Sequence, residues 1–150
     1  GHPYYAIGRE LVKRGEIAKD DVSLQSIRAW LEANPDQATE VMTQNKSYVF
    51  FTELDGEGPV GGEGLPLTPK RSLAVDHSLV PYGMPVWLEA EAPNEASASI
   101  NRLMVTQDTG GAIRGPVRGD FFWGYGAQAE TQAGSMKSKG RYWFLIPKSL

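Results

Sequence analysis

Two aspartates with the chemistry of an acid–base group, Asp108 and Asp120, lie twelve positions apart in the segment QDTGGAIRGPVRGDFFWGYG, residues 107–126. Glycines and a proline separate them, and aromatic residues follow the second. A carboxyl group held beside a substrate can donate or accept a proton. An aspartate before Thr-Gly-Gly is also an ordinary turn residue, because its side chain accepts hydrogen bonds from local amides. Two interpretations are therefore open, a turn cap and a carboxyl group at the edge of a groove.

A third aspartate, Asp76, ends a predicted strand as Asp108 does, whereas Asp120 opens one. Three carboxyl groups at strand ends can gather at one rim of a barrel. Apolar surroundings disfavour the charged form of a carboxyl group, which suits a general acid. Aromatic faces beside carboxyl groups also suit sugar rings, which present apolar C–H faces and hydroxyl edges. The aromatic residues directly after Asp120 are Phe121, Phe122, Trp123 and Tyr125.

The first third of the chain has a helical pattern. Gly15 is expected to end the first helix, and Ser23 is expected to cap the second. Asn34 is expected to cap a third helix that has Pro35 at its first position and ends near Asn45. The segments with a helical pattern are 4–17, with Gly15 as the expected stop, 23–34, and 35–45.

The period of the pattern changes after Asn45. Residues 47–54 are aromatic and β-branched and predict a strand, whereas 56–69 are rich in Gly and Pro and predict a long loop. The intervals between later strands are mostly too short for helical crossovers, which favours a small barrel or sandwich over a doubly wound α/β fold. The later strands are predicted at 72–76, 84–91, 100–108, 119–125 and 141–148.

Composition excludes several classes of function. The formal charge is −3, from 15 basic and 18 acidic residues, and no basic run suggests a nucleic-acid partner. The absence of Cys excludes disulfides, thiol catalysis and zinc–thiolate sites. No paired-His or calcium-loop motif indicates a metal. No apolar segment is long enough to span a bilayer, and no signal peptide is visible. The chain starts in a helical pattern without Met, so we expect it to be a piece of something longer.

Three long segments resemble the C-terminal part of the membrane-bound lytic murein transglycosylase A family. They are RSLAVDHSLVPYGMPVWL, RLMVTQDTGGAIRGPVRGDFFWGYG and AGSMKSKGRYWFLIPK. The opening GHPYYAIGRELVKRGEI and the later NKSYVFF are also similar to this family, so the resemblance covers nearly the whole chain. The part concerned carries the 3D domain, named for three aspartates, which match Asp76, Asp108 and Asp120.

The resemblance implies a mainly β fold, a double-psi β-barrel related to expansins and family-45 endoglucanases, with an N-terminal helical segment. Residues 1–45 would be the end of the family's inserted second domain, and 46–150 the barrel with the 3D domain. In the related groups the corresponding aspartate follows His-Phe. Here Arg118-Gly119 precede Asp120, which is a departure from that pattern.

The activity that the resemblance implies is cleavage of the MurNAc–GlcNAc β-1,4 bond of peptidoglycan, leaving a 1,6-anhydro-muramyl end. Asp120 matches the single catalytic acid and base, and Asp108 matches the aspartate that supports it or holds substrate. Asp76 would be a structural or groove aspartate. Further candidates for the substrate groove are Gly110, Gly111, Trp123 and Tyr125.

The expected partner is a peptidoglycan glycan strand, without cofactor or metal. The expected location is the periplasm at the outer membrane, through an anchor outside this chain. Three alternatives stay open: a glycoside hydrolase with two carboxylates, an expansin-like barrel that binds glycan without cutting it, and a fragment that is inactive alone.

Overall fold

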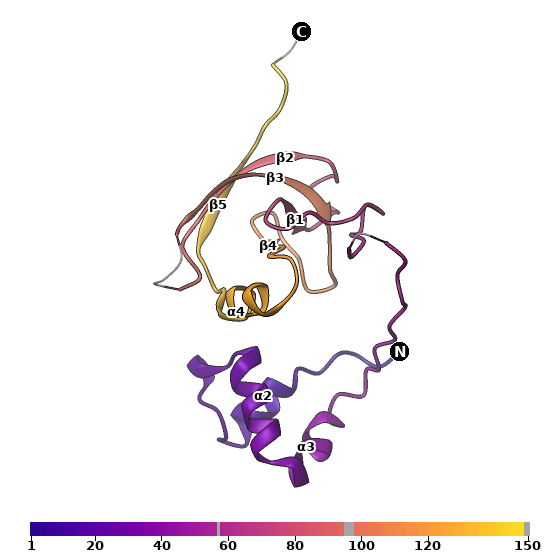
Figure 1. The fold of residues 1–150 in the computed structure, drawn as a ribbon, viewed down its shortest axis with the longest axis vertical. Helices are drawn as coiled ribbons and strands as arrows, with labels where there is room; N and C mark the ends of the chain where they lie inside the picture. Colours follow the sequence, from indigo (N-terminus) through magenta and orange to yellow (C-terminus); the bar gives the residue numbers. More distant parts are fainter. Residues whose placement is uncertain (57, 95–97, 149–150) are drawn as a thin grey trace. The chain divides into compact units, whose positions relative to one another are not determined.

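The computed structural model describes residues 1–56, 58–94 and 98–148. The chain divides into two compact units, Gly1–Glu53 and Leu54–Leu150 (Figure 1). The first unit is helical, and the second contains the sheet that carries the candidate site.

The helical unit confirms the three predicted helices, with small shifts at their ends. Gly15 follows the first helix in a left-handed conformation with φ of 77°, which a residue without Cβ adopts readily. The Ser23 hydroxyl accepts a hydrogen bond from the Ser26 amide at 3.0 Å and caps the second helix as predicted. The helices are α1 (Ile7–Lys13), α2 (Leu24–Ala33) and α3 (Pro35–Met42), with a short 3-10 helix, η1 (Lys19–Asp21), before α2.

The predicted cap of α3 is wrong in one detail. The Asn34 side chain donates to the Trp30 carbonyl at 2.8 Å, at the end of α2, and does not cap α3. Pro35 still occupies the first turn of α3, where its missing N–H leaves no bond unmade.

The strand predicted at 47–54 is also wrong. This stretch has no regular secondary structure and forms no ladder with another strand of the described residues. Tyr48, Phe50 and Phe51 are 80%, 86% and 93% exposed. Aromatic and β-branched residues favour strands because a pleated sheet packs them against neighbours, and among the described residues no strand pairs with this stretch.

The second unit is built on a five-stranded sheet in the order β4-β1-β3-β2-β5. Strand β1 runs parallel to β3, and the other neighbouring pairs are antiparallel. The sequence located all five strands, but β4 and β5 are shorter than predicted. The strands are β1 (Ser72–Val75), β2 (Pro85–Ala90), β3 (Ile100–Asp108), β4 (Gly119–Phe121) and β5 (Gly140–Phe144).

The sheet curls, and α4 (Ala127–Ser135) lies on its concave side (Figure 1). The sequence analysis placed no element at 127–135. The core of this unit is apolar, and Phe121, Trp123 and Met136 pack against it. Its buried members are Leu73, Val75, Val80, Leu88, Ile100 and Met104.

The predicted loop at 56–69 contains no helix or strand among its described residues, and position 57 lies outside them. An isolated bridge joins Val60 to Pro66. A Cβ added at Gly61 would lie 2.4 Å from the backbone oxygen of Gln107 in β3. The loop therefore approaches the sheet so closely that only glycine fits at this point.

Strand β1 sets the relative positions of two of the candidate aspartates. Ala74 pairs with Asp108 of β3 on one side and with Asp120 of β4 on the other. The β1–β3 register shifts between Leu73 and Ala74. The two carboxyl groups are therefore brought to the same level of the sheet from strands that are consecutive in sequence but lie on opposite sides of β1.

Candidate active site

Asp108 and Asp120 line one pocket of about 250 Å³, which we call the aspartate pocket. Ala74 lies between them in the sheet, and its methyl side chain leaves open the space that a larger residue would fill. Two strand spacings separate the aspartate backbones, about 9–10 Å in a flat sheet. The other lining residues are Ser72, Ile113, Phe121 and Phe122.

Asp108 is held by the neighbouring loop. Its carboxylate accepts a hydrogen bond from the Gly62 amide at 2.9 Å. A Cβ on Gly62 would lie 2.4 Å from the Tyr82 hydroxyl oxygen, so glycine allows this close approach. The Thr109 hydroxyl donates to the Val75 carbonyl at 2.8 Å and ties the following turn to β1. One oxygen of Asp108 is thus fixed by a residue distant in sequence, while its side chain lines the pocket.

Asp120 forms a two-point ion pair with Arg118. The guanidinium donates Nε to Oδ1 at 2.5 Å and Nη2 to Oδ2 at 3.1 Å. The side chains are 50% and 45% exposed for Arg118 and Asp120, respectively. Hydrogen bonding and the charge of Asp120 raise the pKa of the Arg118 guanidinium. The apolar setting inferred for Asp120 from the sequence is therefore only partly present, because the carboxylate has a cation beside it and access to solvent.

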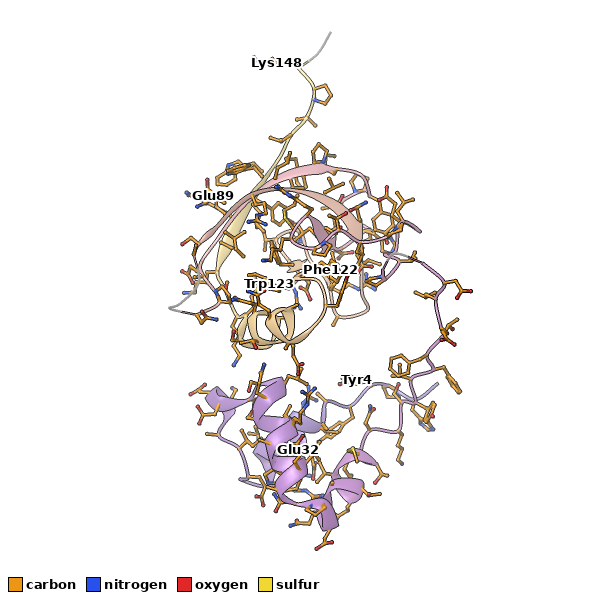
Figure 2. The ribbon with its side chains drawn as sticks, viewed as in Figure 1. Tyr4, Glu32, Glu89, Phe122, Trp123 and Lys148 are labelled. Carbon is orange, nitrogen blue, oxygen red and sulfur yellow. The ribbon has the colours of Figure 1, made fainter. Side chains whose placement is uncertain are left out.

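The aromatic residues after Asp120 wall the site on the α4 side. The Phe121 and Trp123 ring centroids lie 4.6 Å apart. The Trp123 indole donates to the Met136 sulfur at 3.2 Å, and the Lys70 ammonium lies 5.9 Å from the Trp123 ring centroid. Trp123 lies inside the curl of the sheet, between the strands and α4 (Figure 2).

A second pocket of about 510 Å³ adjoins the aspartate pocket, and we call it the side pocket. Asp120 and Phe121 line both pockets. The side pocket extends along Trp123 to the segment after α4. Asp120 therefore has one open space on the side of Asp108 and a larger one on the side of α4.

Asp76 lies apart from this pair in its bonding. It is 5% exposed and accepts hydrogen bonds from the Ser78 hydroxyl at 2.7 Å and the Gly115 amide at 2.9 Å. Arg114 lies 3.4 Å away. These contacts, the Ser78 hydroxyl foremost, lower the pKa of Asp76 to about 2. The carboxylate joins the turn after β1 to the 114–115 loop, and it does not line the aspartate pocket.

The remaining candidate residues do not line the aspartate pocket. Tyr125 is 79% exposed and shares a small hollow with Lys70 and Trp123. Gly110 and Gly111 form the turn after β3 and do not line the aspartate pocket.

The described residues contain neither a candidate metal site nor a helix that could span a membrane. Among residues 1–56, 58–94 and 98–148, no cluster of three or more His, Cys, Asp or Glu is arranged to hold a metal. No helix in these ranges has the length and apolar character needed to cross a bilayer.

The sequence analysis noted Arg118 only as a departure from a pattern, and it missed Gly62 as an anchor for Asp108. The contact between Arg118 and Asp120 could have been predicted, because residues two apart along an extended chain point to the same face. The Gly62 contact joins positions 46 apart, and no local sequence signal indicates it.

Family models match both parts of the chain. The 3D domain matches residues 71–146, and the MltA specific insert domain matches residues 1–52. The chain is 38% identical over 152 residues to membrane-bound lytic murein transglycosylase A of Escherichia coli K12, covering 97% of this chain and 41% of that protein. For the Vibrio cholerae protein of the same name, identity is 36% over 148 residues, with 95% and 40% covered.

Solved structures agree with the sequence matches. MltA from Neisseria gonorrhoeae, in a monoclinic crystal form, is 42% identical with a TM-score of 0.86, covering 99% of this chain and 38% of that one. E. coli MltA with bound chitohexaose is 36% identical with a TM-score of 0.85, covering 96% and 44%. The chain thus spans less than half the length of these relatives. The fold prediction, mainly β of the double-psi barrel type with N-terminal helices, is confirmed. With the 3D domain in its sheet unit and the insert domain in its helices, the chain belongs to the membrane-bound lytic murein transglycosylase A family.

Proposed function

We propose that the protein cleaves the β-1,4 bond between MurNAc and GlcNAc in peptidoglycan and leaves a 1,6-anhydro-muramyl end. The observation that carries this proposal is the pairing of Ala74 with both aspartates, which places Asp108 and Asp120 on one open pocket. The named activity of the relatives and the chitohexaose bound to one of them support a glycan in this pocket.

Asp120 is the proposed catalytic acid and base. Its protonated carboxyl group donates the proton to the glycosidic oxygen while the C1–O bond breaks and positive charge develops on the sugar ring. The C6 hydroxyl of the same sugar then bonds to C1 and gives its proton to the Asp120 carboxylate. An intramolecular hydroxyl is already present at high effective concentration, so no second carboxylate is needed to activate water.

Arg118 acts on both stages of this cycle. Its guanidinium is bonded to both carboxylate oxygens, so the pair must open before Asp120 can reach the glycosidic oxygen. Once the proton has left, the same guanidinium stabilises the new carboxylate. The side chains are about half exposed, which leaves room for this opening.

Asp108 is the proposed supporting residue. The Gly62 amide fixes one of its oxygens, and the carboxylate can face the developing positive charge or hold a sugar hydroxyl. Asp76 is proposed to be structural, because all its described contacts hold the 76–78 turn and the 114–115 loop.

Hydrolysis by two carboxylates is the second candidate, because Asp108 and Asp120 line the same pocket. In an inverting hydrolase Asp108 would activate a water molecule, and the two carboxyl groups of such enzymes lie about 6.5–9.5 Å apart.

Mass spectrometry of the products separates these functions. Purified sacculi are incubated with the 150-residue chain and with a hybrid in which it replaces the matching segment of the E. coli enzyme. An anhydro product is lighter by one water than a hydrolytic one, and a protein that only binds glycan releases neither. The proposal expects the anhydro product from the hybrid and its loss in Asp120→Asn. A reducing-end product would establish hydrolysis instead.

We further propose a periplasmic location at the outer membrane, since peptidoglycan is the substrate and the relatives are named membrane-bound. The division into 1–45 as the end of an inserted domain and 46–150 as the barrel stays a prediction. Detection of the protein in osmotic-shock fractions, with a cytoplasmic marker as control, tests the location.

A further inference from the structure

The position of Asp108 depends on an irregularity in the ladder between β1 and β3. Leu73 pairs with Thr106, and the next residue of β1, Ala74, pairs with Asp108, so Gln107 is the extra residue of a bulge. An extra residue in one strand re-aims the side chains that follow it. The contacts that hold Gln107 in the bulge therefore also fix where the Asp108 carboxyl group lies.

Gln107 is held by both its side chain and its backbone. Its side-chain oxygen accepts a hydrogen bond from the hydroxyl of Ser72, a buried residue of β1, at 2.7 Å. The same hydroxyl accepts a hydrogen bond from the Thr68 amide at 2.8 Å, so its position is fixed as well. The Gln107 carbonyl accepts from the Glu63 amide at 3.1 Å. Because a buried polar group without a partner is unfavourable, these bonds favour one arrangement of the bulge.

The turn that binds the Gln107 carbonyl also binds Asp108. The Gly62 amide donates to the Asp108 carboxylate at 2.9 Å, one position before the Glu63 amide. The turn can approach β3 this closely because a Cβ at Gly61 would lie 2.4 Å from the Gln107 carbonyl oxygen, a space that only glycine leaves free. Two consecutive amides of the turn therefore hold two consecutive residues of β3.

We propose that Gln107 is a positioning residue for Asp108. Through its hydrogen bond with Ser72 it keeps the bulge in place, and the bulge aims the Asp108 carboxylate into the aspartate pocket. Gln107 does not line that pocket, so it acts on the reaction only through Asp108. This inference rests on the proposed function, in which Asp108 supports the reaction at Asp120.

Removal of the Gln107–Ser72 bond from either side tests the role. Gln107→Met keeps the length of the side chain and removes the acceptor, and Ser72→Ala removes the donor. Single-turnover cleavage by the hybrid protein at saturating glycan should fall about fivefold in each variant, the effect of one hydrogen bond. The variant with both substitutions should be no slower than either one, because both remove the same bond.

Gln44→Met is the matched control. Gln44 lies in the helical unit, and its side chain also makes one hydrogen bond, to the Glu40 carbonyl at 3.3 Å. This variant should cleave glycan at the unmodified rate.

A double-mutant cycle with Asp108→Ala separates positioning from a general effect on stability. Asp108→Ala should lower the rate, and the addition of Gln107→Met should not lower it further, because no carboxylate remains to be positioned. The Gln107–Ser72 bond stabilises the fold in either background, so the melting temperature should still fall when Gln107→Met is added. The cleavage rate and the melting temperature thus respond differently to the same substitution.

The outcomes distinguish this inference from the proposed function. An unchanged rate in Gln107→Met or in Ser72→Ala overturns the inference and leaves the proposed function standing. Losses that multiply in the Asp108→Ala background also overturn it, because Gln107 would then act independently of Asp108. A full rate in Asp108→Ala overturns the supporting role of Asp108 together with the inference. Failure of the hybrid to release an anhydro product overturns the proposed function and the inference that rests on it.

Discussion

Replacement of Arg118 by Gln tests the link between the ion pair and the proposed acid. Gln keeps a polar side chain of similar length but removes the charge that is paired with Asp120. Without the pair, the Asp120 side chain should be free to reach the glycan in a larger fraction of molecules. The same change removes the cation that stabilises the carboxylate formed when the proton leaves.

The magnitudes of the two effects differ. An exposed ion pair contributes about 0.2–1 kcal/mol, and the two-point geometry with about half-exposed side chains places this one near the upper value. One kcal/mol corresponds to about a fivefold gain in the fraction of molecules in which the pair is open. The transition state has formed roughly half of the carboxylate charge, so the loss there is about twofold. The net expectation is a rate about twofold higher in low salt, with a smaller difference in high salt, which screens the pair.

Single-turnover cleavage at saturating glycan measures this, with the hybrid protein in low and in high salt. Arg141→Gln is the matched control, because Arg141 also forms a surface ion pair, with Glu89 at 3.1 Å on β2 and β5, away from both pockets. Arg118→Gln should be faster than the unmodified protein in low salt and approach it in high salt, whereas Arg141→Gln should match the unmodified protein in both.

A single result refutes the reasoning. If Arg118→Gln lowers the rate by the same factor in low and in high salt, Arg118 does not act by restraining Asp120. It would then contact the substrate or maintain the local structure, and a melting temperature measured on the same samples distinguishes the two.

Three further outcomes are expected. Asp120→Asn should lower the cleavage rate at least about 10²–10⁴-fold while glycan binding persists, and full activity would remove Asp120 from the mechanism. Asp108→Asn keeps an oxygen that can accept a hydrogen bond from the Gly62 amide. The variant should therefore lose activity while its melting temperature changes little. A large drop in melting temperature with near-normal activity of the folded protein would favour the turn-cap role. The pKa of Asp76 is lowered to about 2, chiefly by Ser78, so its charge stabilises the fold above about pH 4. That contribution should be lost as pH falls from about 4 to 2, and the difference in denaturation midpoint between the unmodified chain and Asp76→Asn should shrink over the same range.

The strands of the sheet were predictable because turn residues such as Gly, Pro and Asp mark their boundaries. Strand β3 has the predicted bounds, since an uninterrupted β-rich run ends at the Thr-Gly-Gly turn. Helix α4 was not predicted because its segment, AQAETQAGS, has no apolar stripe. It contains several alanines, which favour helices on propensity alone, and this was the signal available.

The stretch 47–54 shows the opposite error. Its residues carry the strongest strand signal in the first half of the chain, yet Phe51 is 93% exposed and unpaired in a ladder. Strand propensity expresses how well a residue fits a sheet that is already present. The sequence of residues 47–54 therefore shows a preference for strand structure but does not show whether another strand pairs with them.

The candidate site depends on a feature that no residue pattern indicates. Leu73 pairs with Thr106, so an unbroken parallel ladder would place Ala74 opposite Gln107. The irregularity after Leu73 places Ala74 opposite Asp108 instead. Because successive residues of a strand point to opposite faces, a slip of one position would exchange a carboxyl group for the Gln107 amide at the pocket.

Gln107 itself has a different role, since its side chain accepts a hydrogen bond from the Ser72 hydroxyl at 2.7 Å. That bond joins the strands β1 and β3 just before the irregularity and favours the shifted register. On the other side of β1, Ala74 meets Asp120 through an ordinary antiparallel pair. The twelve-residue spacing of the two aspartates is therefore the length of chain needed to turn from β3 to the far side of β1. Their common pocket follows from one small residue and one register shift in the strand between them.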